Sequence, residues 1–228
     1  MANGNVFIHV GLPKTATTYL QKFVFPQIKG INYFSPAYVS MPNYILSIEA
    51  DERPILISDE HLSSHYFLDE KGWKCGSRFT IANRLKKLFP DANIIIVIRN
   101  KDDWARSLYI QYLKSPYRPN ITFDEFKENL EKTGAIDFES YIEFLKENFN
   151  DVLVLNYEEL KSDPKNFVKK ICDFMKVDMP DHIEQRKTNV RLNLTQLSFI
   201  RWVKNRTWDN KNKKRIIDLF LFLTGGKK

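Results

Sequence analysis

Apolar residues follow two patterns along this chain, and the two patterns alternate. Short continuous apolar runs are typical of strands buried on both faces of a parallel sheet, whereas apolar residues spaced three or four apart indicate amphipathic helices. The continuous runs predict strands at 6–10, 54–58, 93–98 and 152–156. The spaced pattern predicts helices at 17–25, 77–89, 101–114, 122–132, 137–148, 164–175, 194–205 and 213–223, with a variable region before residue 53. This alternation predicts an α/β fold with one central parallel sheet flanked by helices.

A turn rich in hydrogen-bond donors follows the first predicted strand. After Gly11 it contains Pro13, Lys14, Thr15, Ala16, Thr17 and Thr18. The helix that begins inside this turn directs unpaired backbone N–H groups and its positive dipole end at the loop, and Lys14 adds a full charge. These features predict a binding site for a phosphate or sulfate group. The alternative is an ordinary capped helix with Lys14 in solvent.

The turn departs from the Walker A loop of nucleotide kinases. That loop requires the pattern G-x-x-x-x-G-K-[ST], and here no second glycine precedes a Lys-Thr pair. A nucleotide-dependent phosphoryl transferase on a similar sheet is therefore the weaker alternative.

A second candidate for anion binding follows the apolar strand 93–98. This strand ends at Arg99, whose planar guanidinium offers a fork of donors to a phosphate. Ser107 lies two helical turns along the next predicted helix and can return a hydroxyl toward the same point. Taken alone, Arg99 could equally be a salt-bridged residue at a strand end. Because the carboxyl ends of parallel strands meet at one edge of a sheet, we expect Gly11, Asp59 and Arg99 to converge there.

The two segments together resemble sulfotransferases that use 3′-phosphoadenosine 5′-phosphosulfate (PAPS). Residues 13–18 resemble the family's Pro-Lys-[Thr/Ser]-x-[Thr/Ser]-Thr loop, which implies that they hold the 5′-phosphosulfate end of the donor. Arg99 and Ser107 resemble the family's site for the 3′-phosphate, and residues 99–102 resemble its Arg-Asn-x-x-Asp segment. The resemblance implies a P-loop-like sulfotransferase fold, PAPS as the donor and no metal.

A third segment agrees with this resemblance. Residues 157–160, with Asp163 and Pro164 shortly after them, are similar to the family's Tyr-Glu-Asp-Leu…Asp-Pro signature, although Glu159 stands where Asp is common. The similarity implies that Tyr157 lies near the adenine ring of the donor. The alternative is an ordinary aromatic residue at a strand end.

A basic segment near the C-terminus is a further candidate for donor binding. Members of the family often return a basic loop to the 3′-phosphate, which implies that role for Arg186, Lys187 and Arg191. The segment lacks the family's Arg-Lys-Gly form. A solvated basic loop is the alternative.

Activation of an acceptor hydroxyl calls for a general base, and neutralisation of the leaving phosphate calls for cations. Lys14 and the loop donors suit the second task. For the first, strand 54–58 ends in Asp59-Glu60-His61 beside the expected donor loop. Members of the family use either a His or a Glu, which implies a base at Glu60 or His61. We take Glu60 as the first candidate and His61 as the second. Asp59 and His65 are weaker candidates, and each of the four could instead cap the following turn or lie exposed.

The composition is that of a folded basic protein. The chain has 228 residues and a formal net charge of +7 at pH 7, which suits anionic partners. We expect one domain over 1–228, in which 5–176 carries the motifs and 177–228 is helical. Two cysteines without metal-ligand spacing, no signal peptide and no transmembrane run predict a cytoplasmic protein. The predicted helix 213–223 follows a basic run and could meet a membrane or a substrate chain, but we favour a final helix packed on the domain.

We therefore expect a PAPS-dependent sulfotransferase that moves a sulfuryl group to a hydroxyl, or less readily an amine, and releases 3′-phosphoadenosine 5′-phosphate (PAP). The acceptor is left open between a carbohydrate and a small molecule. Besides a phosphoryl transferase, the alternative is a non-catalytic basic module that binds polyanions. Aromatic residues are not interleaved with Lys and Arg on one recognisable face, which argues against nucleic acid as a partner.

Overall fold

A five-stranded parallel sheet forms the centre of the structure. The computed structural model describes residues 5–35, 53–63, 66–69, 72–75, 78–115, 117–183, 192 and 194–225. The strand order is β2-β3-β1-β6-β7, and every neighbouring pair is parallel. The strands are β1 (Val6–His9), β2 (Asn32–Phe34), β3 (Ile55–Ser58), β6 (Asn93–Ile98) and β7 (Asp151–Asn156). The predicted α/β fold is confirmed.

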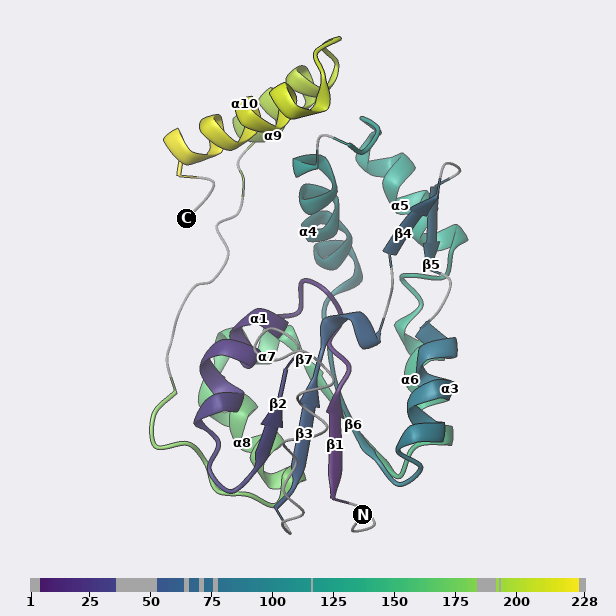
Figure 1. Cartoon of the computed structure of the whole chain (residues 1–228), viewed down its shortest axis with the longest axis vertical. Helices are drawn as coiled ribbons and strands as arrows, with labels where there is room; N and C mark the ends of the chain where they lie inside the picture. Colours follow the sequence, from purple (N-terminus) through teal and green to yellow (C-terminus); the bar gives the residue numbers. More distant parts are fainter. Residues whose placement is uncertain are drawn as a thin grey trace.

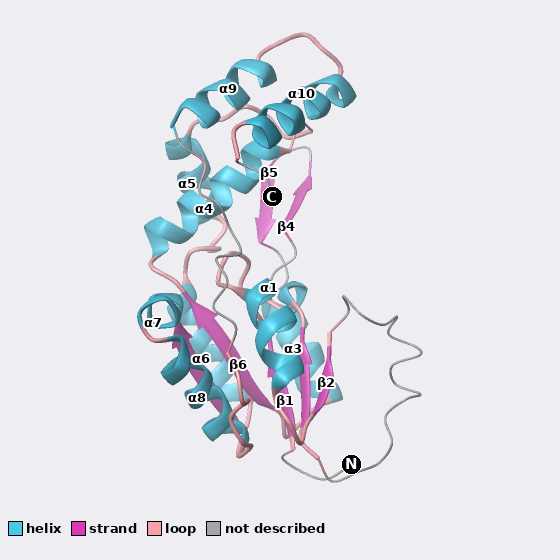
Figure 2. Cartoon of the chain, turned by 90° about the vertical axis from the view of Figure 1, so that its left-hand side faces the viewer, coloured by secondary structure: helices cyan, strands magenta, loops and turns pink. Residues whose placement is uncertain are grey.

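Helices cover both faces of this sheet (Figures 1 and 2). The helices are α1 (Thr17–Tyr19), α3 (Arg78–Leu88), α4 (Lys101–Lys114), α5 (Phe123–Lys132), α6 (Phe138–Asn148), α7 (Tyr157–Ser162), α8 (Pro164–Met175), α9 (Leu194–Lys204) and α10 (Asn210–Leu223). Local signals fix several of their starts. At α5, for example, the Thr122 hydroxyl accepts from the Glu125 N–H while the Glu125 carboxylate accepts from the Thr122 N–H, a capping box that satisfies two otherwise unpaired donors.

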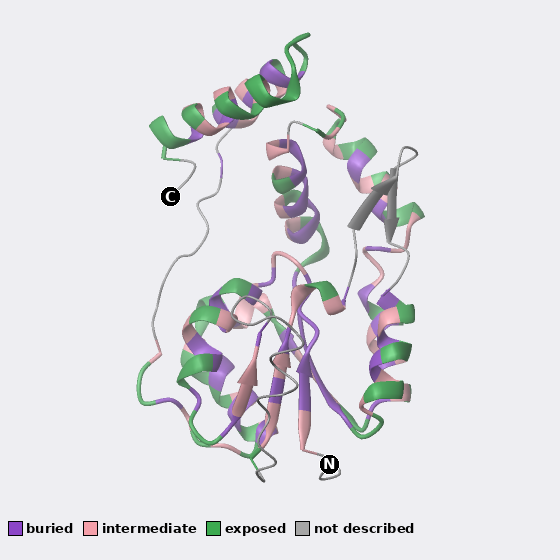
Figure 3. Cartoon of the chain, viewed as in Figure 1, coloured by how far each residue is buried: buried purple, intermediate pink, exposed green. Residues whose placement is uncertain are grey.

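Burial alternates along β6 in the way that a sheet covered on both faces requires. Ile94 and Ile96 belong to the apolar core formed with α3, α4, α5 and α6. Ile95 and Val97 belong to a second core formed with the helix after β1 and with α7 and α8. The continuous apolar run of β6 in the sequence therefore reflects burial on both sides. The strand β2 at the edge of the sheet is only partly buried (Figure 3).

The helix predicted at 17–25 is present but irregular. Only Thr17–Tyr19 is α-helical, followed by a π-helical turn at Leu20–Val24 and a 3₁₀ turn at Phe25–Gln27. Pro26 stands within the last turn. Proline lacks an N–H, and its ring crowds the carbonyl oxygen four residues earlier, so the helix cannot continue regularly through this point.

Four short elements in the described part of the chain were not predicted from the sequence. β2 has three residues and lies inside the variable region. A separate antiparallel hairpin joins β4 (Tyr66–Asp69) to β5 (Gly72–Cys75). The segment after β7 forms α7 where the sequence predicted a turn, so Tyr157 begins a helix instead of ending a strand. Each element has six residues or fewer, a length at which hydrophobic periodicity alone is ambiguous.

The last two helices form a pair at the end of the molecule toward which the strands point (Figure 1). α9 packs on α4 through the buried residues Ile200 and Val203. The ammonium of Lys204 donates to the carbonyl oxygens of Leu113 at 3.3 Å and Ser115 at 2.7 Å. These carbonyls lie at the C-terminal end of α4, where a cation is favoured. The C-terminal helices are thus attached to the body of the protein through α4.

Candidate active site

The carboxyl ends of three strands meet at one edge of the sheet, as the sequence predicts. His9 at the end of β1 lies in register with Ser58 at the end of β3. The N–H of Asp59 then donates to the carbonyl oxygen of His9 over 3.2 Å, and the N–H of Val10 donates to that of Ile95 over 3.1 Å. The loop after β1, the turn after β3 and the end of β6 are therefore neighbours.

The loop between β1 and α1 has an unusual backbone. Gly11, Lys14 and Ala16 have positive φ angles of 31°, 66° and 68°. For residues with a Cβ atom this left-handed conformation costs about 1–2 kcal/mol, and such strain is concentrated at functional sites. The hydroxyls of Thr15 and Thr17 both donate to the carbonyl oxygen of Leu12, at 2.5 and 3.3 Å, so they stabilise the loop itself.

The loop is fastened to the segment that follows β6. The indole Nε1 of Trp104 on α4 donates to the carbonyl oxygen of Pro13 over 2.8 Å. Nη1 of Arg99 donates to the carbonyl oxygen of Lys14 over 3.3 Å. The guanidinium of Arg99 also lies over the ring of Tyr157, 4.7 Å from its centroid. Arg99 thus connects the loop with the first residue of α7.

One donor of Arg99 has no partner in the described part of the chain. Its Nε atom is buried and makes no hydrogen bond among the residues that the structure describes. Leaving a buried donor unpaired costs about 1–3 kcal/mol, and more for a charged group. An anion at this place would remove that cost, so the residues present fit a phosphate-bearing ligand.

Charges around the Lys14 side chain also favour an anion. Burial lowers the pKa of Lys14 below its ordinary value, and the nearby cations Lys114 and Arg99 lower it further, whereas Glu60 raises it. The two neighbouring cations therefore disfavour the charge on Lys14. A bound anion would offset this repulsion.

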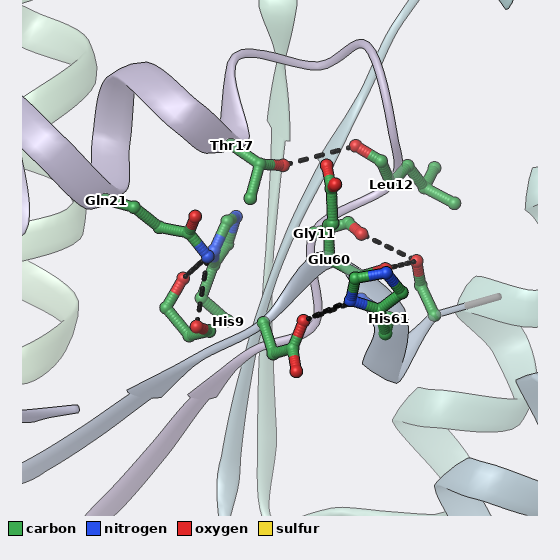
Figure 4. Close-up of polar contacts among 10 residues, drawn as sticks. His9, Gly11, Leu12, Thr17, Gln21, Glu60 and His61 are labelled. Atoms are coloured by element: carbon green, nitrogen blue, oxygen red, sulfur yellow. Dashed lines mark hydrogen bonds and ion pairs between the residues drawn. The ribbon is translucent and has the colours of Figure 1, made fainter. Parts of the chain in front are cut away.

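The turn after β3 contains the candidate bases, and Figure 4 shows them beside the loop. Asp59 caps the short 3₁₀ turn Glu60–Leu62 by accepting from the N–H of His61. Its carboxylate also binds Nδ1 of His61 at 2.9 Å. The Ser63 hydroxyl donates to the carbonyl oxygen of Gly11 over 2.6 Å. This turn is therefore held against the loop, and the capping role considered for Asp59 is confirmed.

Buried polar residues beneath the loop were not identified from the sequence. Nδ1 of His9 lies 2.7 Å from the Ser58 hydroxyl, and the Gln21 amide donates to both the hydroxyl and the carbonyl oxygen of Ser58. Burial lowers the pKa of His9 to about 3, so the imidazole is neutral at neutral pH. The available signal was the placement of polar His9 and Ser58 at the ends of two otherwise apolar strands.

For the other predicted site residues the structure gives a position and, at Tyr157, the contact with Arg99 described above. Ser107 is half-buried on α4, Tyr157 begins α7 as described, and Thr18 is exposed on α1. The predicted loop residues Arg186, Lys187 and Arg191, like the weaker base candidate His65, lie outside the described residues.

These features define a P-loop-like α/β protein, in which the loop after the first strand lies beside an arginine that ends the neighbouring strand. The sulfotransferase domain model matches residues 5–216, and the chain belongs to this family. The resemblance stated from the sequence is thereby confirmed.

Known proteins agree at the level of the family and the fold. The chain is 33% identical over 103 residues to sulfotransferase 1A1 of Bos taurus, covering 41% of this chain and 35% of that protein. The match thus spans about a third of the length of this curated relative. A sulfotransferase from Alicyclobacillus acidocaldarius has a similar fold, with a TM-score of 0.57, 18% identity, and coverage of 96% of this chain and 97% of that one.

A second solved structure has the same fold in a complex. Mouse sulfotransferase SULT7A1, solved with PAP, aligns with a TM-score of 0.50 and 21% identity over 90% of this chain and 66% of that chain.

Within the part of this chain that the structure describes, no helix has the length and apolar character needed to cross a membrane.

Proposed function

We propose that this protein transfers a sulfuryl group from PAPS to a hydroxyl group of a carbohydrate or small-molecule acceptor, with an amine as a less favoured acceptor. The acceptor oxygen forms a bond to sulfur while the bond between sulfur and the 5′-phosphate oxygen breaks. PAP leaves, and the proton of the acceptor hydroxyl passes to a base on the protein. The membership of the chain in the sulfotransferase family supports this assignment.

One observation carries the proposal: the hydrogen bond from Arg99 to the carbonyl oxygen of Lys14. Two motifs separated by 85 residues in the sequence are in direct contact there. A nucleotide that carries a charged group at its 5′ end and a phosphate at its 3′ end needs cations in two places that are close together. Lys14 with the loop would serve the 5′ end, and Arg99 with Ser107 would serve the 3′ end.

The protein's own contribution to the reaction would be alignment and charge neutralisation. By analogy with phosphoryl transfer, most of the rate enhancement comes from these two effects. Lys14 and the N–H groups at the start of α1 would stabilise the charge that develops on the leaving phosphate. The fastened loop supports this role because donors held in place need no reorganisation during the reaction.

Glu60 and His61 are the candidate bases, and each has an observation in its favour. Glu60 lies close enough to Lys14 to raise the pKa of that ammonium, which supports a role for its carboxylate at the expected reaction centre. The ring of His61 is oriented through Nδ1 by the Asp59 carboxylate. Such a contact leaves Nε2 as the nitrogen that can accept a proton. We retain Glu60 as the first choice.

The donor assignment is tested by calorimetric titration of PAP. Wild-type protein should bind PAP, and Lys14→Ala should weaken binding about 10- to 100-fold, since a charge-assisted hydrogen bond contributes about 1.5–3 kcal/mol. Lys22→Ala is the matched control because Lys22 is exposed one helical turn beyond the loop. Absence of PAP binding, or equal binding by Lys14→Ala, would refute the proposal. Magnesium-dependent ATP binding in its place would favour the phosphoryl transferase.

The base assignment is tested by transfer of labelled sulfate from PAPS to a panel of sugars, phenols and alcohols. For an acceptor that reacts, Glu60→Gln should reduce kcat about 100-fold or more while PAP affinity is unchanged, since general-base catalysis contributes about 10²–10⁴-fold. His61→Asn is measured in parallel. A loss confined to His61→Asn would transfer the role to His61, and near-normal turnover in both variants would exclude a base in this turn.

A further inference from the structure

The final helix α10 has two dissimilar faces. Ile217 and Leu221 are buried in the core that includes α9, so the packed final helix predicted from the sequence is present. The opposite face remains uncovered. Leu219, Phe222 and Leu223 are 59%, 72% and 72% exposed. A helix that is packed only on the domain has no need of these side chains.

Aromatic side chains extend this apolar surface from α10 to α9 and the turn between them. The ring of Phe220 stacks on Phe199 with centroids 3.9 Å apart, and Phe199 stacks on Trp202 at 5.8 Å. Trp202 contacts Trp208 edge to face at 5.9 Å. Both tryptophans are substantially exposed, at 46% and 41%.

Exposed apolar side chains are concentrated at this place. Eight large apolar side chains are exposed among the residues that the structure describes, and five of them belong to α9, α10 and the turn that joins them. We call these five the C-terminal patch: Trp202, Trp208, Leu219, Phe222 and Leu223. Figure 3 shows the largely exposed outer side of this helix pair. Exposed apolar side chains gathered in one place, with stacked rings between them, are typical of an interaction site.

Cations surround the patch. Residues 194–225 contain seven Lys and Arg residues and two Asp residues, a net charge of +5 out of +7 for the whole chain. The exposed cations next to the patch are Arg206, Lys211, Lys214 and Arg215. The guanidinium of Arg206 lies 4.2 Å from the centroid of the Trp202 ring. The partner that covers the patch must therefore combine an apolar phase with negative charge.

We propose that the C-terminal patch docks on the surface of an anionic phospholipid membrane. Leu219, Phe222 and Leu223 would enter the boundary between headgroups and acyl chains, and the neighbouring cations would contact the phosphates. Tryptophan suits this boundary because its ring is apolar and its N–H is polar. α10 has 14 residues, about 21 Å of helix, and carries five charged side chains. It would therefore lie in the plane of the membrane.

The position of the patch gives this docking a direction. The helix pair lies at the end of the molecule toward which the sheet strands point (Figure 1). The candidate active site is at the carboxyl edge of the same strands. A membrane bound to the patch would thus lie beyond α4, on the active-site side of the sheet.

The test is co-sedimentation of the full chain with sucrose-loaded vesicles. One set contains phosphatidylcholine alone, and the other contains equal amounts of phosphatidylcholine and phosphatidylglycerol. We expect binding to the anionic vesicles that weakens as salt is raised, and little binding to the neutral ones. Equally weak sedimentation with both sets would overturn the proposal. So would tight binding to duplex DNA in the absence of vesicle binding.

Two triple variants separate the apolar and the charged contributions. Leu219→Ser with Phe222→Ser and Leu223→Ser should weaken vesicle binding at least about tenfold. Lys211→Gln with Lys214→Gln and Arg215→Gln should weaken it about 100-fold, since each cation near an anionic surface contributes about 1 kcal/mol. All six side chains are exposed or lie on the uncovered face, so both variants should retain the native circular dichroism spectrum.

The control for charge is Arg84→Gln with Lys87→Gln and Lys146→Gln, which removes three exposed cations from α3 and α6. Its vesicle binding should match that of the wild type. Equal weakening in the control would show a general charge effect and overturn the assignment to the patch. A concentration-dependent dimer that the Ser triple variant abolishes, without vesicle binding by the wild type, would assign the patch to a second copy of the chain instead.

Discussion

Nη1 of Arg99 lies 3.3 Å from the carbonyl oxygen of Lys14 and donates a hydrogen bond to it. The contact uses one of the five N–H donors of the guanidinium, and the buried Nε is left without a partner among the described residues. Arg99 can therefore support the loop and bind a ligand at the same time. These two roles predict different consequences for two substitutions.

Arg99→Ala should weaken PAP binding about 10- to 100-fold, because it removes charge-assisted hydrogen bonds to the ligand and the support of the Lys14 carbonyl. Arg99→Lys should recover only part of this loss, since an ammonium keeps the charge but lacks the planar fork. Calorimetric titration with PAP measures both. Arg84→Ala, at an exposed position on α3, is the control. Unchanged affinity in Arg99→Ala would remove Arg99 from the donor site.

Gly11→Ala should destabilise the fold and the loop together. A Cβ atom at this position would lie 2.8 Å from the Thr17 hydroxyl and 3.1 Å from Cε1 of His9, at a φ of +31°. Overpacking of this kind costs about 1–3 kcal/mol in addition to the backbone strain. Chemical denaturation should show the loss of stability, and calorimetry should show weaker PAP binding.

Gly30→Ala is the control that separates the cost of overpacking from the cost of backbone strain in Gly11→Ala. Gly30 also has a positive φ, +74°, but a Cβ atom there would meet nothing within 4 Å. It should therefore show only the cost of the left-handed backbone, about 1–2 kcal/mol, and should leave PAP affinity unchanged. Equal losses of stability at Gly11 and Gly30 would mean that the loop yields easily around Gly11.

The sequence predicted the parts of this structure whose signals are local. The strand 93–98 and five of the helices predicted after it, α4, α5, α6, α8 and α9, have continuous or periodic apolar residues, and their observed bounds differ from the predicted ones by at most one residue. The last helix, α10, begins three residues before its predicted start at 213. The convergence of the loop and Arg99 followed from a general rule for parallel sheets. The polar contacts beneath the loop could not be predicted, because the partnership of His9, Ser58 and Gln21 depends on strand register and on the irregular turn at Leu20–Val24.

The buried imidazole of His9 should make the protein sensitive to acid. Its pKa in the folded state is about 3, below the ordinary value of 6.5, so the unfolded state binds more protons between these two pH values. Stability should thus be fully present above about pH 6.5 and fall by about 1.4 kcal/mol per pH unit below it. Urea denaturation from pH 7 to about pH 5 measures this slope in wild type and in His9→Gln, where it should be smaller.

His182→Gln is the control for this slope, because His182 is exposed. Its pH dependence should match that of the wild type. If His9→Gln does not fold, the imidazole proton resonances of the wild type give the same information. A His9 signal that titrates near pH 6.5 would contradict a neutral buried ring.

Lys204 should have an effect of the same sign at alkaline pH. Burial, with help from Arg118 and Lys213, lowers its pKa from 10.5 to about 8. Between these values the unfolded state retains a proton that the folded state has released, so the contribution of Lys204 to stability should increase with pH. The difference in unfolding free energy between wild type and Lys204→Met isolates this contribution. From about pH 8 to about pH 10 this difference should change in favour of the wild type.

The control is the same comparison with Lys146→Met, at an exposed position on α6, which should show no such change with pH. If the difference for Lys204→Met is constant over this range, the ammonium that joins α9 to α4 is not desolvated, and the junction is open to water.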